Sequence, residues 1–395
     1  MASRLASNYL PLPVTIIKAS NIFLWDNHYK LYIDLLAGYS AVNQGHCHPR
    51  IINALIHQAN MVTLTSRVVQ STSLFKWANY ITNKFKYDNV LAMNSGAEAV
   101  ETAIKMARKY GALHNRSHIV CLKGNFHGRT LGTISLSDYE FYRIGFGPFI
   151  NNILHVEMNN VNDLRQVFEQ NGSKIAAVLY EPVQGEGGVV PMTTEFVEAM
   201  RTLKHEHPEV LFISDEIQAG LGRTGQLTTS DDHYRFKPDA LILGKALSGG
   251  VIPMSCVLAN KNVMKVFTPG THGSTFGGNP LACAVSMEAV DVIEQECIPN
   301  TNRLSPLLKK MLHDLSKKYI TDVRGIGMFW GIQFKKEYDV EALRLRMLDA
   351  GYITCTSRNN TLRITPPLTI SYIELEMAVE RLEKEIPRIG HTIAL

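Results

Sequence analysis

Three short apolar runs in the middle of the chain, each followed by a charged residue, constrain its fold most. Each run has five or six residues and is bounded by polar or turn residues, as buried strands are. The runs are residues 175–180, 210–214 and 240–244. They are followed by Glu181, Asp215 and Lys245. Because ligands bind outside the carboxyl ends of the strands in an open α/β sheet, these charged groups predict one shared site.

Asp215 and Lys245 together suit a cofactor that reacts with amines. A lysine amine can bond covalently to an aldehyde once burial or a neighbouring charge lowers its pKa. Pyridoxal phosphate requires such a lysine, and it requires an acid that keeps its ring nitrogen protonated so that the ring accepts electrons. An ordinary salt bridge at the strand ends is the alternative that these two residues alone leave open.

Composition narrows the class of protein. The chain has 395 residues, 45% of them hydrophobic and 19% charged, which is typical of a globular protein with two or three domains. Its net charge of +4 includes no run of Lys and Arg, which argues against nucleic acid as a partner. No apolar segment approaches the roughly 18 residues that span a bilayer, so no membrane span is expected.

The location in the cell follows from the cysteines and the N-terminal residues. Six Cys are scattered without a C-x-x-C pair, which favours reduced thiols. Residues 1–7 lead directly into residues 8–14, which leaves no room for a signal or transit peptide. These features predict a cytoplasmic protein, although removal of a leader would give the same sequence.

The first fifty residues predict a hairpin and a binding loop. Residues 21–36 alternate apolar and polar side chains around a turn at 26–28, as a hairpin does. The segment 38–49 is too polar and irregular for a strand, but it carries Tyr39 and two histidines. Without a third ligand nearby these histidines are not expected to bind a metal, so the segment is predicted to contact a ligand as a loop.

A strand, a turn and a helix predict an anion site near Gly96. Residues 89–93 form a short apolar run, which turns through Asn-Ser-Gly into a helix expected to end before Gly111. A helix N-terminus binds anions because its free N–H groups and its dipole both face the ligand. Gly96 and Ala97 are therefore candidate phosphate donors, with a plain helix cap as the alternative.

The next strand runs into a loop with two candidate contacts. Residues 119–122 read as a strand that leads into Gly124-Asn-Phe-His-Gly-Arg-Thr. Phe126 can stack on a flat ligand, and Arg129 can bind a carboxylate through two parallel hydrogen bonds. A predicted helix at 194–206, between two of the strands, gives the βαβ order of a parallel sheet.

Residues 220–225 match the G-x-G-x-x-G pattern of dinucleotide-binding folds. The pattern is not a good dinucleotide site, because residues 215–219 separate it from the preceding strand and no apolar helix follows it.

The pattern of elements changes near residue 300. Helix and strand signals then alternate, including strands at 328–334 and 361–367. This change predicts an N-terminal segment (1–36) that packs with a small C-terminal domain (298–395), and a large cofactor-binding domain (37–297) between them.

Six motifs, in this order and spacing, resemble one family. They are YSAVNQGHCHP (39–49), NSGAEA (94–99), EPVQGE (181–186), DEIQ (215–218), LGKALSGG (243–250) and HGSTFGGNP (272–280). The chain resembles the class III, fold type I, pyridoxal-phosphate aminotransferases, and among them the ornithine aminotransferase group, over nearly its whole length. The resemblance implies a mostly parallel central sheet with helices on both faces, plus a smaller α+β domain.

The resemblance also implies how the cofactor is held. Lys245 would bond to the cofactor and, once displaced by substrate, would carry the proton between substrate and cofactor. Asp215 would pair with the ring nitrogen, and Gln218 would contact the ring hydroxyl. Phe126 would stack on the ring.

The phosphate contacts implied by the resemblance come from two subunits. Gly96 and Ala97 would donate backbone N–H groups to the phosphate. Ser274 and Thr275, in a Gly-rich segment, would reach the phosphate of the neighbouring subunit's cofactor. The protein would therefore be a homodimer with shared active sites.

The implied substrates are L-ornithine, which reacts through its δ-amino group, and 2-oxoglutarate. Arg129 would bind the α-carboxylate of ornithine and later the distal carboxylate of 2-oxoglutarate. Arg363 would bind the α-carboxylate of the oxo acid, and Glu186 would mask Arg363 while ornithine is bound. Tyr9 and Tyr39 would supply polar contacts to ornithine. The products, glutamate and glutamate 5-semialdehyde, which cyclises to pyrroline-5-carboxylate, imply proline biosynthesis and arginine metabolism.

The sequence departs from its relatives at informative positions. Enzymes similar to 4-aminobutyrate or N-acetylornithine aminotransferase tend to carry a smaller or apolar residue in place of Tyr39. His127 and Ala219 stand where other ornithine aminotransferases commonly have Trp and Thr. Aminotransferases for those two other substrates, and a non-catalytic binding protein on the same fold, remain the alternatives.

Overall fold

A seven-stranded sheet forms the centre of the computed structural model, which describes residues 4–389. In spatial order its strands are β4 (Asn89–Met93), β12 (Ser255–Ala259), β11 (Ala240–Leu243), β10 (Leu211–Asp215), β7 (Ile175–Tyr180), β5 (His118–Leu122) and β6 (Ile153–Val156). Only β12 runs antiparallel to its neighbours in this sheet. The prediction of a mostly parallel sheet is confirmed, and β7, β10 and β11 are the three apolar runs.

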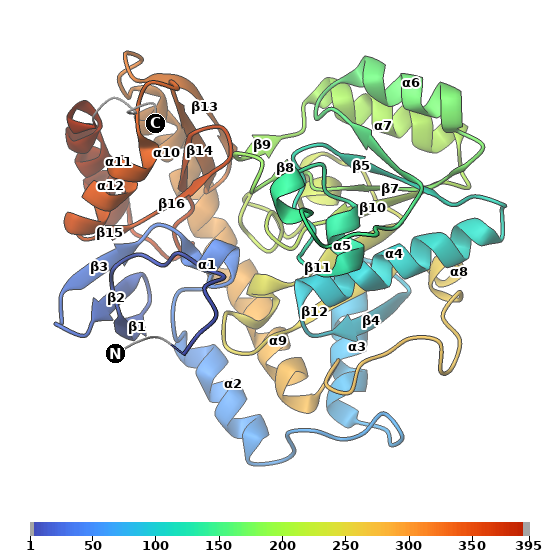
Figure 1. Cartoon of the computed structure of the whole chain (residues 1–395). Helices are drawn as coiled ribbons and strands as arrows, with labels where there is room; N and C mark the ends of the chain where they lie inside the picture. The colour runs from blue at the N-terminus through green and yellow to red at the C-terminus, as the bar shows by residue number, and fades with distance from the viewer. Residues whose placement is uncertain (1–3, 390–395) are drawn as a thin grey trace.

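Helices cover both faces of this sheet (Figure 1). Helix α4 (Gly96–Ala112) packs on one face, and α6 (Val161–Asn171) and α7 (Thr194–Glu206) pack on the other. All residues of β7 and β10 are buried, because strands covered on both faces need apolar side chains on both.

Helix α4 ends two residues later than the sequence predicts, and the reason is Gly111. A Cβ at this glycine would lie 2.4 Å from the Cβ of Ala176 in the sheet. Gly111 therefore lets the helix approach the sheet closely, and it does not stop the helix.

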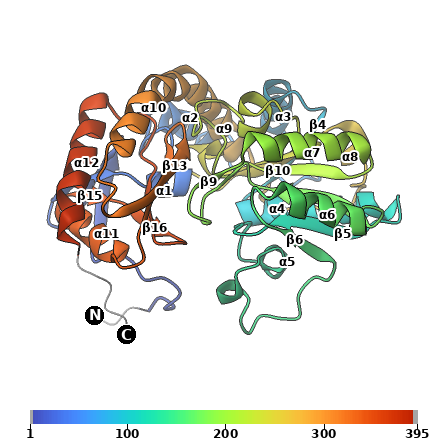
Figure 2. The ribbon, with the colours of Figure 1, turned by 90° about the horizontal axis from the view of Figure 1, so that it is seen from above.

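The predicted hairpin is present as part of a four-stranded sheet. Its strands are β1 (Ile16–Ser20), β2 (Phe23–Asp26), β3 (Leu31–Asp34) and β15 (Tyr352–Ile353). Since β15 pairs in parallel with β3, a strand from beyond residue 300 completes the N-terminal sheet (Figure 1). Figure 2 shows from above that β15 lies on the same side of the molecule as α11 and α12.

A second small sheet carries most of the C-terminal strands. It contains β13 (Ile320–Ile326), β14 (Phe329–Phe334), β17 (Thr361–Ile364) and β16 (Cys355–Ser357) in this order. The neighbouring helices are α10 (Ile298–His313), α11 (Val340–Asp349) and α12 (Tyr372–Glu385). The boundaries 1–36, 37–297 and 298–395 stay a prediction, and residues 1–3 and 390–395 lie outside the described residues.

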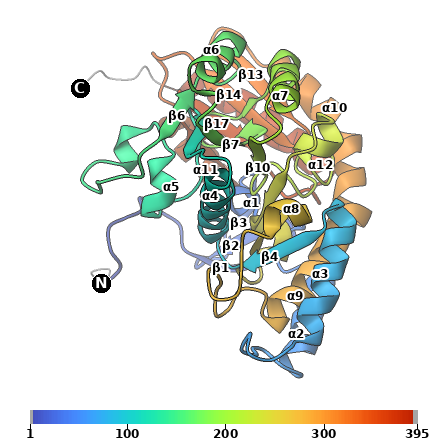
Figure 3. The ribbon, with the colours of Figure 1, turned by 90° about the vertical axis from the view of Figure 1, so that its right-hand side faces the viewer.

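The remaining helices lie beside the edge strand β4 or in connections. Figure 3 shows α2 (Pro49–Ala59), α3 (Thr72–Phe85) and α9 (Pro280–Val292) together, and α3 and α9 contact each other. The short elements are α1 (Ala37–Ser40), α5 (Leu131–Ser135), α8 (Lys261–Met264), β8 (Val183–Gln184) and β9 (Val190–Pro191). Across residues 4–389, no helix has the length and apolar character that crossing a membrane requires.

Candidate active site

The carboxyl ends of β7, β10 and β11 open into a cavity of about 230 Å³. Six residues predicted to bind a cofactor line it: Gly96, Ala97, Phe126, Asp215, Gln218 and Lys245. Glu181, His127, Gly128 and Ile217 complete the lining. The prediction that these strand ends share one site agrees with this geometry.

Lys245 enters the cavity from the turn that follows β11. Burial lowers the pKa of its amine to about 8, although the nearby carboxylates of Glu186 and Asp215 act in the opposite direction. Its backbone has a left-handed φ of 46°, a conformation that costs a residue with a side chain roughly 1–2 kcal/mol. A buried amine with a lowered pKa is what a nucleophilic lysine requires.

Asp215 is paired with His127 and not with the lysine. His127 Nδ1 lies 2.7 Å from Asp215 Oδ2, and both side chains are buried. Burial alone would lower the pKa of His127, but the hydrogen bond and charge of Asp215 raise it above its ordinary value. The salt-bridge alternative for Asp215 and Lys245 is therefore not what the structure contains, and Asp215 has a supporting group behind it.

Glu181, at the end of β7, is a second buried acid beside this pair. Burial raises the pKa of its carboxyl group to about 7. One of its oxygens accepts a hydrogen bond from the backbone N–H of Phe126 at 2.9 Å. Glu181 therefore fixes the loop that carries Phe126 at the cavity wall.

The N-terminus of α4 forms one end of the cavity. Ser95 and Glu98 make a capping box, in which the Ser95 hydroxyl accepts from the N–H of Glu98 and the Glu98 carboxylate accepts from the N–H of Ser95. Gly96 and Ala97 have no preceding helical turn to accept their N–H groups, so these groups are available to an anion.

The cavity fits pyridoxal phosphate. A Cβ on Gly96 would lie 2.9 Å from the terminal methyl of Ile217, so glycine leaves this end open without moving that side chain. The buried Nε2 of His127 has no hydrogen-bond partner within residues 4–389. His127 can therefore keep the hydrogen bond between its Nδ1 and Asp215 whether Nε2 is protonated or not. The cavity thus brings together the helix N-terminus at Gly96, the ring of Phe126, the acid Asp215 and the amine of Lys245.

Arg363, in β17, lies behind the cavity with its side chain fully buried. Its Nη1 lies 2.7 Å from Glu186 Oε1, and its Nη2 donates a hydrogen bond to Gln218 Oε1 at 2.8 Å. The ring of Tyr39 lies 5.5 Å from the guanidinium carbon. The predicted Glu186–Arg363 pair is thus present, and the same arginine holds Gln218.

The other predicted residues lie outside the cavity lining. Arg129 is exposed, and its guanidinium carbon lies 5.5 Å from the ring of Phe126. Tyr9 is 76% exposed. The hydroxyl of Ser274 accepts a hydrogen bond from the Asn94 side chain, and Thr275 is exposed.

Comparison with known families decides what kind of protein carries this site. The family model described as aminotransferase class-III matches residues 4–386. The chain belongs to the class III aminotransferases.

Individual relatives of this aminotransferase cover nearly the same length. Ornithine aminotransferase 1 of Staphylococcus saprophyticus is 44% identical over 391 residues, which cover 96% of this chain and 97% of that protein. An ornithine aminotransferase of Bacillus cereus (strain 03BB102) is 45% identical over 385 residues, covering 96% and 95%.

Solved structures give the same picture. Toxoplasma gondii ornithine aminotransferase superposes with a TM-score of 0.94 at 36% identity, covering 98% of this chain and 92% of that one. That structure is described as having partial occupancy of PLP at its active site. An acetylornithine aminotransferase of Elizabethkingia anophelis has a TM-score of 0.86 at 38% identity, covering 98% and 96%. The predicted family and the fold type I architecture are confirmed.

Sequence reasoning missed two features of this aminotransferase. His127 was noted only as a departure from relatives, although it follows the end of β5, a strand next to β7, and so had to lie near the predicted site. The second feature is the stacking of Arg129 and Arg358 on the ring of Tyr142. No sequence pattern predicts this contact, because Arg358 lies far from the other two residues in the chain.

Proposed function

We propose that this aminotransferase transfers the δ-amino group of L-ornithine to 2-oxoglutarate. The products would be L-glutamate and glutamate 5-semialdehyde, which cyclises to pyrroline-5-carboxylate, so the reaction would serve proline biosynthesis and arginine metabolism. The buried ion pair between Arg363 and Glu186 carries this proposal. Relatives of 44% and 45% identity that are named ornithine aminotransferases support it.

The ion pair favours ornithine because it controls where a carboxylate binds. While Glu186 neutralises Arg363, the inner arginine does not attract the carboxylate of ornithine, which would bind Arg129 instead. The δ-amino group at the other end would then face Lys245. In the second half-reaction the α-carboxylate of 2-oxoglutarate would replace Glu186 on Arg363. Tyr39 and Tyr9 would contact the α-amino end of ornithine.

Pyridoxal phosphate would be the cofactor, and the residues that line the cavity support this choice. When bound, it supplies an aldehyde that takes up the amino group and a ring that takes up the electrons of the broken C–H bond. The residues that would hold it are Lys245 at the aldehyde, Asp215 at the ring nitrogen, Gln218 at the ring hydroxyl, Phe126 on the ring face, and Gly96 and Ala97 at the phosphate.

The residues of the chain would carry the proton steps. With a pKa of about 8, roughly one-tenth of the Lys245 amine is neutral at pH 7, far more than at its ordinary pKa, and a displaced neutral amine can take a proton from the substrate carbon. Asp215, hydrogen-bonded to His127, would hold the positive ring nitrogen. His127 would donate its Nδ1–H to the Asp215 carboxylate, and this hydrogen bond raises the pKa of His127.

A homodimer would complete the site, and the cytoplasm would be its location. Ser274 and Thr275 lie outside the cavity of their own chain, which suits residues that reach a second subunit's phosphate. All six cysteines are free, which suits a reducing compartment.

The test is a spectrum of the purified holoenzyme before and after addition of ornithine. Wild-type protein should be yellow and should bleach with ornithine, and Lys245→Ala should lose both transamination and the visible band of the lysine-bound cofactor. Normal turnover by Lys245→Ala would remove this lysine from the chemistry, and a colourless wild-type protein with no turnover would favour a binding protein.

A substrate panel separates the proposal from its neighbours. The acetylornithine aminotransferase of similar fold makes N-acetylornithine the first competitor to test, followed by 4-aminobutyrate. Ornithine should have the highest kcat/KM of the three. A preference for N-acetylornithine would leave the aminotransferase assignment intact and overturn the substrate.

A further inference from the structure

Arg358 links the small C-terminal sheet to the loop region beside the candidate site. It lies in the turn between β16 and β17, and its guanidinium carbon lies 4.0 Å from the ring centre of Tyr139 and 5.4 Å from that of Tyr142. Both tyrosines belong to the segment after α5, next to the central sheet. We call these three residues the arginine–tyrosine bridge.

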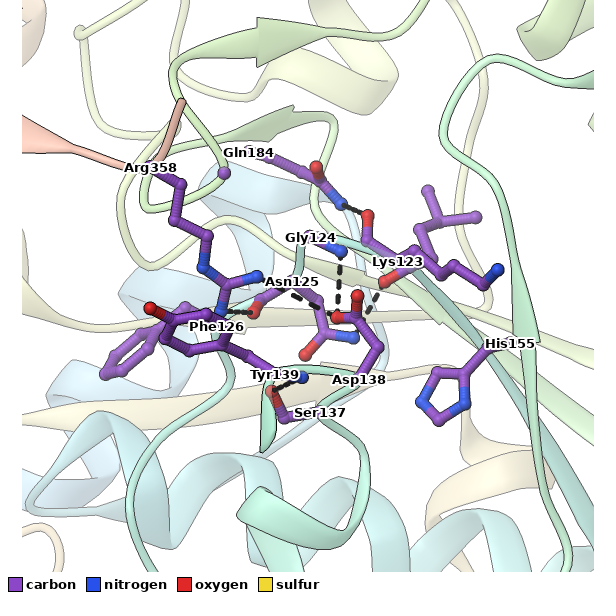
Figure 4. A network of polar contacts seen from close by, with 12 residues as sticks. Lys123, Gly124, Asn125, Phe126, Ser137, Asp138, Tyr139, His155, Gln184 and Arg358 are labelled. Atoms are coloured by element: carbon purple, nitrogen blue, oxygen red, sulfur yellow. Dashed lines mark hydrogen bonds and ion pairs between the residues drawn. The ribbon is translucent and has the colours of Figure 1, made fainter. Parts of the chain in front are cut away.

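Polar contacts hold Arg358 in place, as Figure 4 shows. Its Nη1 lies 3.8 Å from Asp138 Oδ1, and this oxygen also accepts the backbone N–H of Gly124 at 2.9 Å. Its Nη2 donates to the carbonyl oxygen of Asn125 at 3.5 Å. Arg358 therefore contacts the chain immediately before Phe126, which lines the cavity.

Tyr142 connects the bridge to the outer arginine. Its ring meets the rings of Tyr139 and Phe126 edge to face, with centres 4.9 and 5.8 Å apart. The guanidinium carbon of Arg129 lies 4.7 Å from the same ring. Arg358 and Arg129 thus contact one ring, and a displacement of this ring changes the support of both.

Arg129 depends on these rings for its position. Within residues 4–389 it has no hydrogen bond or ion pair, and its recorded contacts are with Phe126 and Tyr142. An arginine held by ring faces keeps its planar set of N–H donors free for a carboxylate. The support of the rings therefore decides how well the guanidinium is oriented before substrate arrives.

We propose that Arg358 is a positioning residue for substrate carboxylates, which acts on Arg129 through Tyr139 and Tyr142. The inference rests on the proposed function, in which Arg129 binds a carboxylate of each substrate. The backbone N–H of Arg358 also donates a hydrogen bond to the carbonyl oxygen of Glu186 at 3.3 Å. The turn that holds the Glu186 segment therefore also holds the ring under the outer arginine.

The first test compares Arg358→Met with wild-type holoenzyme. Loss of the cation over the rings should raise the KM for ornithine and for 2-oxoglutarate about tenfold, within the range expected for partly buried cation–π contacts. The kcat and the visible spectrum should change little, because Lys245 and Asp215 are untouched. Arg358→Lys, which keeps a cation over Tyr139, should stay within about threefold of wild type.

A matched control and a structural readout accompany this variant. Arg381→Met removes an arginine from α12 that pairs with Glu385 at 3.3 Å, and both KM values should stay unchanged. Trypsin cleavage after Arg143, in the segment that contains Tyr139 and Tyr142, should become faster in Arg358→Met only.

The deciding test is a double-mutant comparison with binding of glutarate, a dicarboxylate that cannot react. Arg358→Met should weaken glutarate binding about tenfold in titration calorimetry when Arg129 is present, and less than twofold in an Arg129→Met background. Equal losses in both backgrounds, or unchanged binding in the single variant, would overturn the inference. If wild-type enzyme failed to convert ornithine, the proposed function would fail, while the glutarate comparison would still decide the role of Arg358.

Discussion

Two arginines are buried equally deeply in this molecule and are held in opposite ways. Neither Arg223 nor Arg363 exposes any of its surface. Arg223 donates hydrogen bonds to the carbonyl oxygens of Met328, at 3.0 Å, and Pro366, at 2.7 Å, and to the side-chain oxygen of Asn43. Arg363 instead pairs with a carboxylate, that of Glu186.

The partners decide which arginine can take part in a reaction. The contacts of Arg223 join three segments that are distant in sequence, and none of its acceptors can leave without opening the core. Burial lowers the pKa of Arg223 to about 9, and the nearby charge of Arg363 acts in the same direction, whereas the carboxylate of Asp34 offsets only part of this shift. Arg363 can exchange Glu186, whose side chain is 21% exposed, for a substrate carboxylate and keep its charge compensated throughout.

Lys245 is a third buried cation and shows another solution. An amine can lose its proton, and burial lowers the pKa of Lys245 to about 8. The charge of Arg223 is thus stabilised mainly by carbonyl oxygens, and that of Arg363 by a carboxylate that a substrate can replace. Lys245 can lose its charge by releasing a proton. Only the last two are suited to chemistry.

Removing Arg363 should have the largest effect on activity. In Arg363→Met the kcat/KM for 2-oxoglutarate should fall about 10³-fold, because a charged two-donor contact to the α-carboxylate is worth roughly 4 kcal/mol. The urea midpoint should change little, since Glu186 can turn toward water. Steady-state kinetics measures the loss of kcat/KM, and urea unfolding measures the stability. A strongly destabilised Arg363→Met with intact kcat/KM would mean that Arg363 is structural and does not bind the substrate.

Removing Arg223 should have the opposite profile. Arg223→Met leaves three buried acceptors without a donor and should lower the free energy of unfolding by about 3 kcal/mol. The kcat/KM per folded molecule should stay within about threefold. Arg223→Lys should recover only part of the stability, because a single ammonium cannot replace a planar group with several donors. An unchanged urea midpoint for the Met variant would contradict this view.

Changing the exchangeable acid should separate the two half-reactions. In Glu186→Gln the charge of Arg363 is no longer neutralised, so the ornithine carboxylate is drawn to the wrong arginine. Single-turnover rates should fall about 30-fold with ornithine and less than threefold with glutamate, whose α-carboxylate would use Arg363 in any case. Equal losses in both half-reactions would count against Glu186 as a mask.

The sequence predicted those parts of the fold and site that depend on local patterns. The strands before Glu181, Asp215 and Lys245 were recognisable because runs buried on both faces are continuously apolar and end abruptly. Gly96 was recognisable because a strand, a glycine and a helix form an anion site from neighbouring residues.

Contacts between distant segments could not be read in this way. The two-residue strand β15 is too short for any periodic signal, although it completes the N-terminal sheet. The pairing of Arg358 with Tyr139 depends on how two separate loops meet. Gly111 was misread because a glycine needed for close packing looks the same in sequence as one that ends a helix.

The pH dependence of cofactor binding should report the lowered pKa of the Lys245 amine. The neutral form of Lys245 bonds to the aldehyde, and its fraction rises as pH increases through about 8. The rate at which apoprotein takes up pyridoxal phosphate should therefore increase about tenfold from pH 7 to pH 9 and then level off. Stopped-flow absorbance measures this rate. A rate that kept rising to pH 10 would mean that the amine has its ordinary pKa.

The smallest effect is expected at Tyr39, whose ring lies beside Arg363. The backbone of Tyr39 has a left-handed φ of 58°, which a β-branched side chain adopts poorly, so Tyr39→Leu is a better apolar substitution than Tyr39→Ile. Tyr39→Leu should raise the KM for ornithine about threefold and lower that for 4-aminobutyrate, because a hydroxyl and a ring face are lost next to the inner arginine. Tyr39→Phe keeps the ring and should retain the 4-aminobutyrate value. If both variants kept the wild-type preference, selection of substrate would depend on the exchange at Arg363 alone, and the tyrosine would only shield that exchange from water.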